Sequence, residues 1–193
     1  MAVMVTRARG NGRTPSLIAA LMVITAAAGL SGATVMATVG LASGSFAALS
    51  RGLIVVMACA SLAVARYRRD RPWQLDTETQ IAWLERENLN VALWNGLVLG
   101  AGFLSRIGFW LWWTLPVLVF AGGSPGLGIA AGAAYGVTRL GVSSLVAIPS
   151  IRSARDFLPR AGAFKRRAAF AADLSFAGAT TVALVAGLSL VMH

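Results

Sequence analysis

The fold class is decided by the stretch from Pro15 to Ala65, which reads PSLIAALMVITAAAGLSGATVMATVGLASGSFAALSRGLIVVMACASLAVA. Arg51 is the only charged residue in it. A transmembrane helix needs about 20 consecutive apolar residues, so this run is long enough for two. Its best interruption is the small polar cluster Ala-Ser-Gly-Ser near the middle. We therefore expect helices near 16–40 and 46–66.

The composition extends this interpretation to the whole chain. Of 193 residues, 57% are hydrophobic and 12% are charged, and the mean hydropathy is +0.72. A soluble domain carries about 25% charged residues, so this chain has too little polar surface to cover a water-soluble globule. We expect a single membrane domain over 1–193, an all-α polytopic bundle with about five transmembrane helices in the lipid bilayer.

Three further apolar runs complete the predicted bundle. They lie near 90–111, 127–149 and 169–191. The first of these ends in a cluster of tryptophans, and tryptophan concentrates at membrane–water interfaces. We therefore expect this helix to end at the membrane surface.

The segment 114–126 admits two interpretations. It contains two prolines and two adjacent glycines, which favour a short turn or a re-entrant piece on the far side of the membrane. Alternatively, the preceding helix continues to Phe120 with a kink at Pro116, because proline removes a backbone hydrogen bond.

The distribution of positive charge predicts the orientation. Fourteen of the 17 basic residues lie in three groups, before position 14, at 66–86 and at 152–167. Basic residues beside transmembrane helices concentrate on the cytoplasmic side. Five spans place the N-terminus and the loops 67–89 and 150–168 inside, and the C-terminus outside. We expect a bacterial-type cytoplasmic membrane, such as a cell inner membrane.

The three remaining arginines, Arg51, Arg106 and Arg139, fall inside predicted spans. An arginine at the bilayer centre costs about 2.5 to 3.5 kcal/mol, so such residues usually face a bundle interior, a cavity or a partner. Arg51 and Arg106 lie near helix ends, from which they can also extend to the headgroups. As solute-binding residues we predict these arginines and their polar neighbours: Arg51, Ser105, Arg106, Tyr135, Thr138 and Arg139.

The surroundings of two of these arginines partly repeat. Each has a ladder of small residues, then an aromatic residue, then Ser or Thr, Arg, Ile or Leu, and Gly, at 96–108 and 128–141. Consecutive spans run in opposite directions, so a true repeat would be inverted, as in many secondary transporters. Arg106 and Arg139 would then converge on an anion, which arginine can bind in bidentate geometry.

Other residues have predicted roles in ion pairing or packing. Asp173 is the one acidic residue inside a predicted span, so we expect an ion pair or a proton site there. Small residues four positions apart let membrane helices approach closely. The predicted helix-packing residues are Gly128, Gly132, Gly136, Ala179, Ala183 and Gly187.

Several classes of function lack their residues. The single cysteine, Cys59, excludes an internal disulfide, and no His, Cys, Asp and Glu cluster has metal-ligand spacing. We expect no metal, no cofactor and no catalytic residues. A net charge of +10 would suggest nucleic acid in a soluble protein, but these charges flank membrane spans, so we expect none.

The sequence thus leaves two main hypotheses for function, and a membrane enzyme ranks third. The first is a small transporter or membrane-embedded transporter subunit that handles an anionic or polar solute. The second is a non-catalytic accessory or assembly subunit of a larger membrane complex, whose arginines are structural. Both predict a homo-oligomer or partner membrane subunits, because the small-residue faces suit helix docking.

Overall fold

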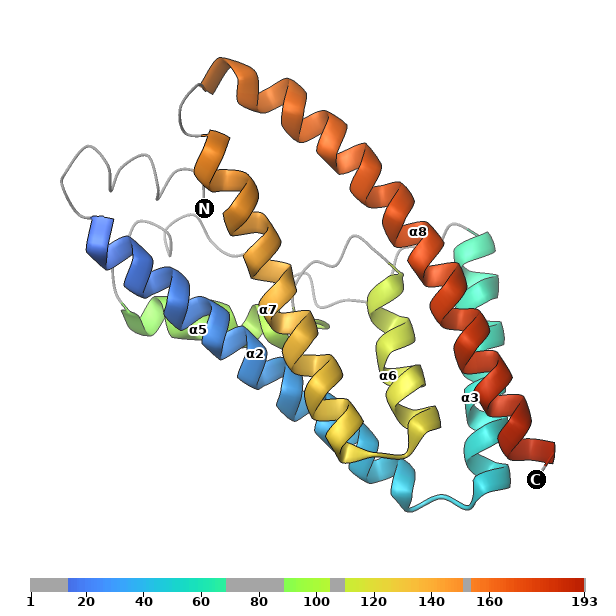
Figure 1. Cartoon of the computed structure of the whole chain (residues 1–193). Coiled ribbons are helices and arrows are strands. Elements are labelled where there is room, and N and C mark those ends of the chain that lie inside the picture. Colours follow the sequence, from blue (N-terminus) through green and yellow to red (C-terminus); the bar gives the residue numbers. More distant parts are fainter. Residues whose placement is uncertain (1–13, 69–88, 105–109, 151–153, 193) are drawn as a thin grey trace.

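The computed structural model describes residues 14–68, 89–104, 110–150 and 154–192. Within these residues the chain is entirely helical and contains no strand. Figure 1 shows the six helices, which are α2 (Thr14–Gly44), α3 (Ala48–Tyr67), α5 (Leu89–Ala101), α6 (Leu111–Gly122), α7 (Pro125–Ser150) and α8 (Ala154–Met192).

The long helices alternate in direction along the bundle. α2 descends in the view of Figure 1 to a short connection, from which α3 ascends, and later α7 ascends while α8 descends beside α3. The α2–α3 and α6–α7 connections lie at one end of the bundle, as does the last turn of α8. Consecutive long helices are therefore roughly antiparallel.

α5 and α6 together run in the direction of α2. α5 packs on the first half of α2 through the cluster of Ile24, Ala28 and Ala92. α6 packs on its second half, where Met36 contacts Trp112 and Val119. The two short helices therefore cover successive halves of α2.

The break between α5 and α6 differs from the uninterrupted helix expected at 90–111. The chain leaves the helix after Ala101, and Gly102 has a φ of 78°, in the left-handed region that favours glycine. The Phe103 N–H donates to the carbonyl of Ala101 instead of continuing the helical pattern. Residues 102–104, which follow α5, are called the helix break below.

The segment 114–126 is mostly helical. α6 passes through Pro116 and ends at Gly122, so the turn is confined to two residues before α7 begins at Pro125. Gly123 closes α6 with a φ of 62°, and its N–H donates to the carbonyl of Val119. Helix continuation past Pro116 matches the second sequence interpretation, but the interruption lies earlier, at Gly102.

α8 is much longer than the helix expected at 169–191. It begins at Ala154, so most of the expected loop 150–168 has a helical backbone. Alanine, lysine and arginine favour helix, so a high density of charge did not require a loop there. Most of the other expected loop, 67–89, lies outside the described residues.

Small residues bring α2 and α7 into backbone contact. A Cβ added to Gly132 would collide with the carbonyl oxygen of Gly32, and one added to Gly136 would collide with that of Ala28. A Cβ added to Gly100 of α5 would collide with the Ala28 carbonyl as well. α5 and α7 therefore both approach the backbone of α2 at distances that only glycine allows.

The outer surface of the bundle is apolar. Large hydrophobic side chains are exposed on every helix for which side chains are described except α6, among them Leu30, Met57, Trp94, Ile129 and Val185. In the described ranges, three helical segments are long and apolar enough to cross a membrane: Met22–Gly44, Ala48–Tyr67 and Phe170–Met192. These features fit a helical membrane protein.

Candidate functional site

Arg139 on α7 lies at the carboxyl end of α5. Its Nη1 donates to the backbone carbonyl of Leu99 at 2.9 Å and to the hydroxyl of Tyr135 at 2.8 Å. Tyr135 precedes Arg139 by one helical turn, so both side chains lie on the same face of α7. The guanidinium is also 5.8 Å from the centroid of the Tyr135 ring, within cation–π range.

The Leu99 carbonyl is available to Arg139 because α5 ends at Ala101. The last four carbonyls of a helix have no partner within it. In a continued helix the Leu99 carbonyl would accept from the Phe103 N–H, but that N–H donates to Ala101. Arg139 supplies the missing donor, and its positive charge faces the negative end of the α5 dipole.

The other predicted neighbours of Arg139 have different positions. Thr138 is exposed, and its hydroxyl donates to the Ala134 carbonyl of its own helix. Ser105 and Arg106 lie outside the described residues, so the predicted convergence of two arginines remains a prediction. The structure brings together Arg139, Tyr135 and the end of α5.

Arg51 on α3 lies at the carboxyl end of α6. A Cβ added to Gly123 would collide with Nη1 of Arg51, so the guanidinium lies directly against the glycine that closes α6. The Nε of Arg51 is buried and has no hydrogen-bond partner within the described part of the chain. A positive charge at the carboxyl end of α6 is again favourable.

Arg51 and Arg139 do not form a common site. Gly123 directly precedes the Ser124–Pro125 start of α7, whereas Arg139 lies about 20 Å further along that helix at about 1.5 Å per residue. Each arginine instead meets the carboxyl end of one half of the α5–α6 pair. Of the two, only Arg139 lies beside the helix break.

Asp173 forms an ion pair with Arg66. The Arg66 Nη2 and Asp173 Oδ2 atoms are 3.0 Å apart, and the two side chains are 39% and 55% exposed. This pair joins the last turn of α3 to α8. Asp173 therefore does not serve as the counter-charge of Arg139.

The predicted packing residues divide between two interfaces. Gly128, Gly132 and Gly136 face α2, where a Cβ on Gly128 would collide with the Met36 carbonyl. On α8, Gly187 meets Gly52 and Val55 of α3. Ala183 is buried in the same interface, with Val55 and Cys59, and Ala179 is half-buried.

Several residues of this region were not singled out from the sequence. Gly102 lies in the helix break and Trp112 of α6 packs against it. Leu99 contributes its backbone carbonyl to the contact with Arg139, which no side-chain pattern reveals. The signal for the break was the run Gly100-Ala101-Gly102 inside an apolar span, because glycine within a helical pattern weakens it.

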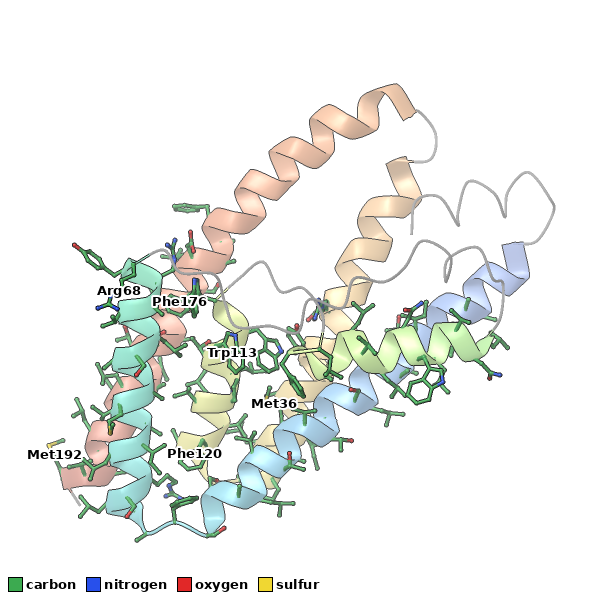
Figure 2. The ribbon with its side chains drawn as sticks, turned by 180° about the vertical axis from the view of Figure 1, so that it is seen from behind. Met36, Arg68, Trp113, Phe120, Phe176 and Met192 are labelled. Atoms are coloured by element: carbon green, nitrogen blue, oxygen red, sulfur yellow. The ribbon has the colours of Figure 1, made fainter. Side chains whose placement is uncertain are left out.

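Figure 2 shows Trp113 near the top of α6, with Met36 of α2 below it, close to where the chain passes from α5 to α6. Trp112, its neighbour, is 5% exposed and packs edge-on against the Trp113 ring with centroids 4.8 Å apart. The region beside Arg139 is thus aromatic, with the Trp112 ring buried in it.

No protein-family model, curated protein or solved structure matches this chain.

Proposed function

We propose that the chain crosses the membrane five times, with its N-terminus in the cytoplasm and its C-terminus outside. α2, α3, α7 and α8 each provide one crossing, and α5 and α6 together provide the third. The alternating directions of the helices support this arrangement, as do the basic groups before α2, after α3 and at the start of α8.

Cysteine labelling tests this topology. Ser124, in the α6–α7 connection, is exposed, so a Ser124→Cys variant of a Cys59→Ser background is expected to react with an impermeant reagent from outside. A Ser153→Cys variant is expected to react only after the membrane is opened. Equal labelling of the two variants in sealed cells would contradict the five-crossing arrangement.

Within this topology, we propose a small transporter or transporter subunit of a bacterial-type cytoplasmic membrane, which binds an anionic or polar solute at the helix break. The observation that carries this proposal is the position of Arg139 between the Leu99 carbonyl and the Tyr135 hydroxyl. Non-helical backbone at membrane depth is tolerated where protein buries it or where it lines a cavity, and many transporters bind solutes at such breaks.

Arginine suits this role because of its charge and shape. Its planar guanidinium binds carboxylate or phosphate with two parallel hydrogen bonds. Hydrogen bonds with an ionised donor or acceptor are roughly twice as strong as neutral–neutral ones, and in an arginine–anion bond both partners are ionised. A solute anion is therefore a stronger acceptor for Arg139 Nη1 than the Leu99 carbonyl or the Tyr135 hydroxyl.

The second candidate is an accessory or assembly subunit of a larger membrane complex, working through partner subunits or further copies of the chain. The accessory role is favoured if the Arg139 hydrogen bonds to Leu99 and Tyr135 serve only to stabilise the carboxyl end of α5. Gly178, on an exposed part of α8, has no atom near the position of an added Cβ, which leaves room for another helix.

Ligand-dependent stability in detergent distinguishes these candidates. The purified protein is heated with chloride, sulfate, phosphate or acetate at constant ionic strength, beside Arg139→Lys and Arg68→Ala variants. A ligand at 100 times its Kd stabilises the folded state by about 2.7 kcal/mol. We expect at least one anion to stabilise the wild type and the Arg68→Ala variant, but not the Arg139→Lys variant.

The two variants are matched controls for each other. Lysine at 139 keeps the charge and one donor for the Leu99 carbonyl but loses the bidentate fork. Arg68 is an exposed arginine at the end of α3, so its removal reports non-specific charge effects. If no anion stabilises the wild type more than the Arg139→Lys variant, the solute site is refuted and the accessory role is favoured.

A further inference from the structure

An aromatic cluster, formed by Phe103, Trp112, Trp113 and Tyr135, surrounds the helix break. The Trp112 ring is at its centre, with centroids 6.4 Å from Phe103, 4.8 Å from Trp113 and 6.2 Å from Tyr135. These rings come from the break, from the first turn of α6 and from α7. Three separate segments therefore bring aromatic surface to one place.

Among the residues that the structure describes, the indole N–H of Trp112 has no acceptor. Trp112 is 5% exposed, and its Nε1 atom is buried without a hydrogen-bond partner. A Cβ added to Gly102 would collide with this same edge of the ring, so the N–H lies against the backbone of the break. Buried tryptophan N–H groups usually have a partner, and an unsatisfied one calls for an explanation.

The ring that carries the unsatisfied N–H and the charged group both contact Tyr135. The Trp112 and Tyr135 ring centroids are 6.2 Å apart, and the Arg139 guanidinium lies 5.8 Å from the Tyr135 centroid. A cation, aromatic rings and an unsatisfied neutral donor are thus grouped around one tyrosine. This set of groups suits a ligand that combines an anion, an aromatic body and an oxygen acceptor.

We propose that the solute is an aromatic carboxylate that carries a second oxygen acceptor on its ring. Its carboxylate binds the Arg139 guanidinium in place of the Leu99 carbonyl, its ring packs in the aromatic cluster, and its second oxygen accepts from Trp112 Nε1. This inference rests on the solute site proposed above and names the chemistry of its ligand. Offset or edge-on ring packing favours an aromatic body over an aliphatic one.

Binding of three sodium salts tests the proposal in steps. Acetate, benzoate and 4-hydroxybenzoate are compared by calorimetry on the wild-type protein in detergent. We expect benzoate to bind about tenfold more tightly than acetate because its ring is buried. We expect 4-hydroxybenzoate to gain about a further fivefold from the Trp112 hydrogen bond.

The Trp112→Phe variant tests the proposed hydrogen bond between Trp112 Nε1 and the ligand. Phenylalanine keeps an aromatic ring in the core and removes the indole N–H, which has no partner among the described residues. The variant is expected to bind benzoate and 4-hydroxybenzoate equally. Trp94, exposed on α5, provides the matched control, and Trp94→Phe is expected to keep the wild-type preference. Thermal unfolding of both variants without ligand checks that they are folded.

The outcomes separate this inference from the proposed function. If acetate binds through Arg139 but benzoate binds no better, the solute site stands and the aromatic ligand is refuted. The ligand is refuted as well if Trp112→Phe keeps the preference for 4-hydroxybenzoate. If none of the three salts binds, and no inorganic anion does, both proposals fail together.

Discussion

Replacing Gly132 with alanine is expected to push α7 away from α2. The added Cβ would collide with the carbonyl oxygen and carbonyl carbon of Gly32 and lie close to the amide nitrogen of Ala33. All three atoms belong to backbone, so no side chain can rotate to relieve the overlap. The two helices must separate by roughly 1 Å before the new methyl group reaches ordinary contact distance.

The magnitude follows from the loss of contacts along this interface. A gap of 0.5 to 1 Å forfeits about a quarter to a half of the dispersion energy of each atom pair across it. Overpacking of a close interface typically costs about 1 to 3 kcal/mol. Alanine recovers up to about 1 kcal/mol through its higher helix propensity. We expect Gly132→Ala to lower the free energy of unfolding by about 1 to 2 kcal/mol.

The measurement is unfolding by sodium dodecyl sulfate in mixed micelles, followed by circular dichroism. Gly178→Ala is the control, because nothing lies within 4 Å of a Cβ at that position. The control is expected to match the wild type or exceed it slightly. If Gly132→Ala is as stable as Gly178→Ala, the close crossing of α2 and α7 is refuted.

Three further predictions concern other contacts. Gly123→Ala is expected to lower the free energy of unfolding by about 1 to 2 kcal/mol, because Gly123 has a left-handed φ and its new Cβ would overlap Arg51. Adding Arg51→Ala to the same chain should recover part of that loss. Strict additivity of the two substitutions in a double-mutant cycle would contradict the contact. Asp173→Asn is expected to change the free energy of unfolding by less than about 1 kcal/mol, because the ion pair of Asp173 with Arg66 is exposed. A larger loss in thermal unfolding would indicate a role of Asp173 beyond this ion pair. Ser31→Ala removes the 2.7 Å hydrogen bond from the Ser31 hydroxyl to the Leu97 carbonyl of α5. We expect the free energy of unfolding to fall by about 1 kcal/mol in the same assay. An unchanged unfolding midpoint would argue against close packing of α2 on α5.

The all-helical, apolar character of the chain could be predicted from sequence because it depends on local properties. The helices expected at 16–40 and 46–66 correspond to α2 and α3 within a few residues, because the Ala-Ser-Gly-Ser cluster breaks a long apolar run. The sequence prediction of a loop at 150–168 is wrong for most of that range, because α8 begins at Ala154. The charged residues there suggest a loop, but alanine, lysine and arginine also favour helix.

The break after Ala101 could not be predicted in the same way. Hydropathy is continuous through Gly102, and the Leu99 carbonyl that the break releases is satisfied by Arg139 from another helix. Such a contact joins positions far apart in sequence. The contact between Tyr135 and Arg139 could be predicted from the sequence, because residues four apart share a helical face. The partner of Asp173 could not, because it depends on how α3 packs against α8.

The dependence of α5 on Arg139 has a consequence for how the chain enters the membrane. During synthesis α5 and α6 emerge from the ribosome before α7 does. Until α7 arrives, the last carbonyls of α5 face lipid or the insertion machinery without the guanidinium that satisfies one of them, and an unsatisfied group costs several kcal/mol in hydrocarbon. The third and fourth crossings of the proposed topology should therefore leave the translocon as a pair, with the arginine and the broken helix shielding each other.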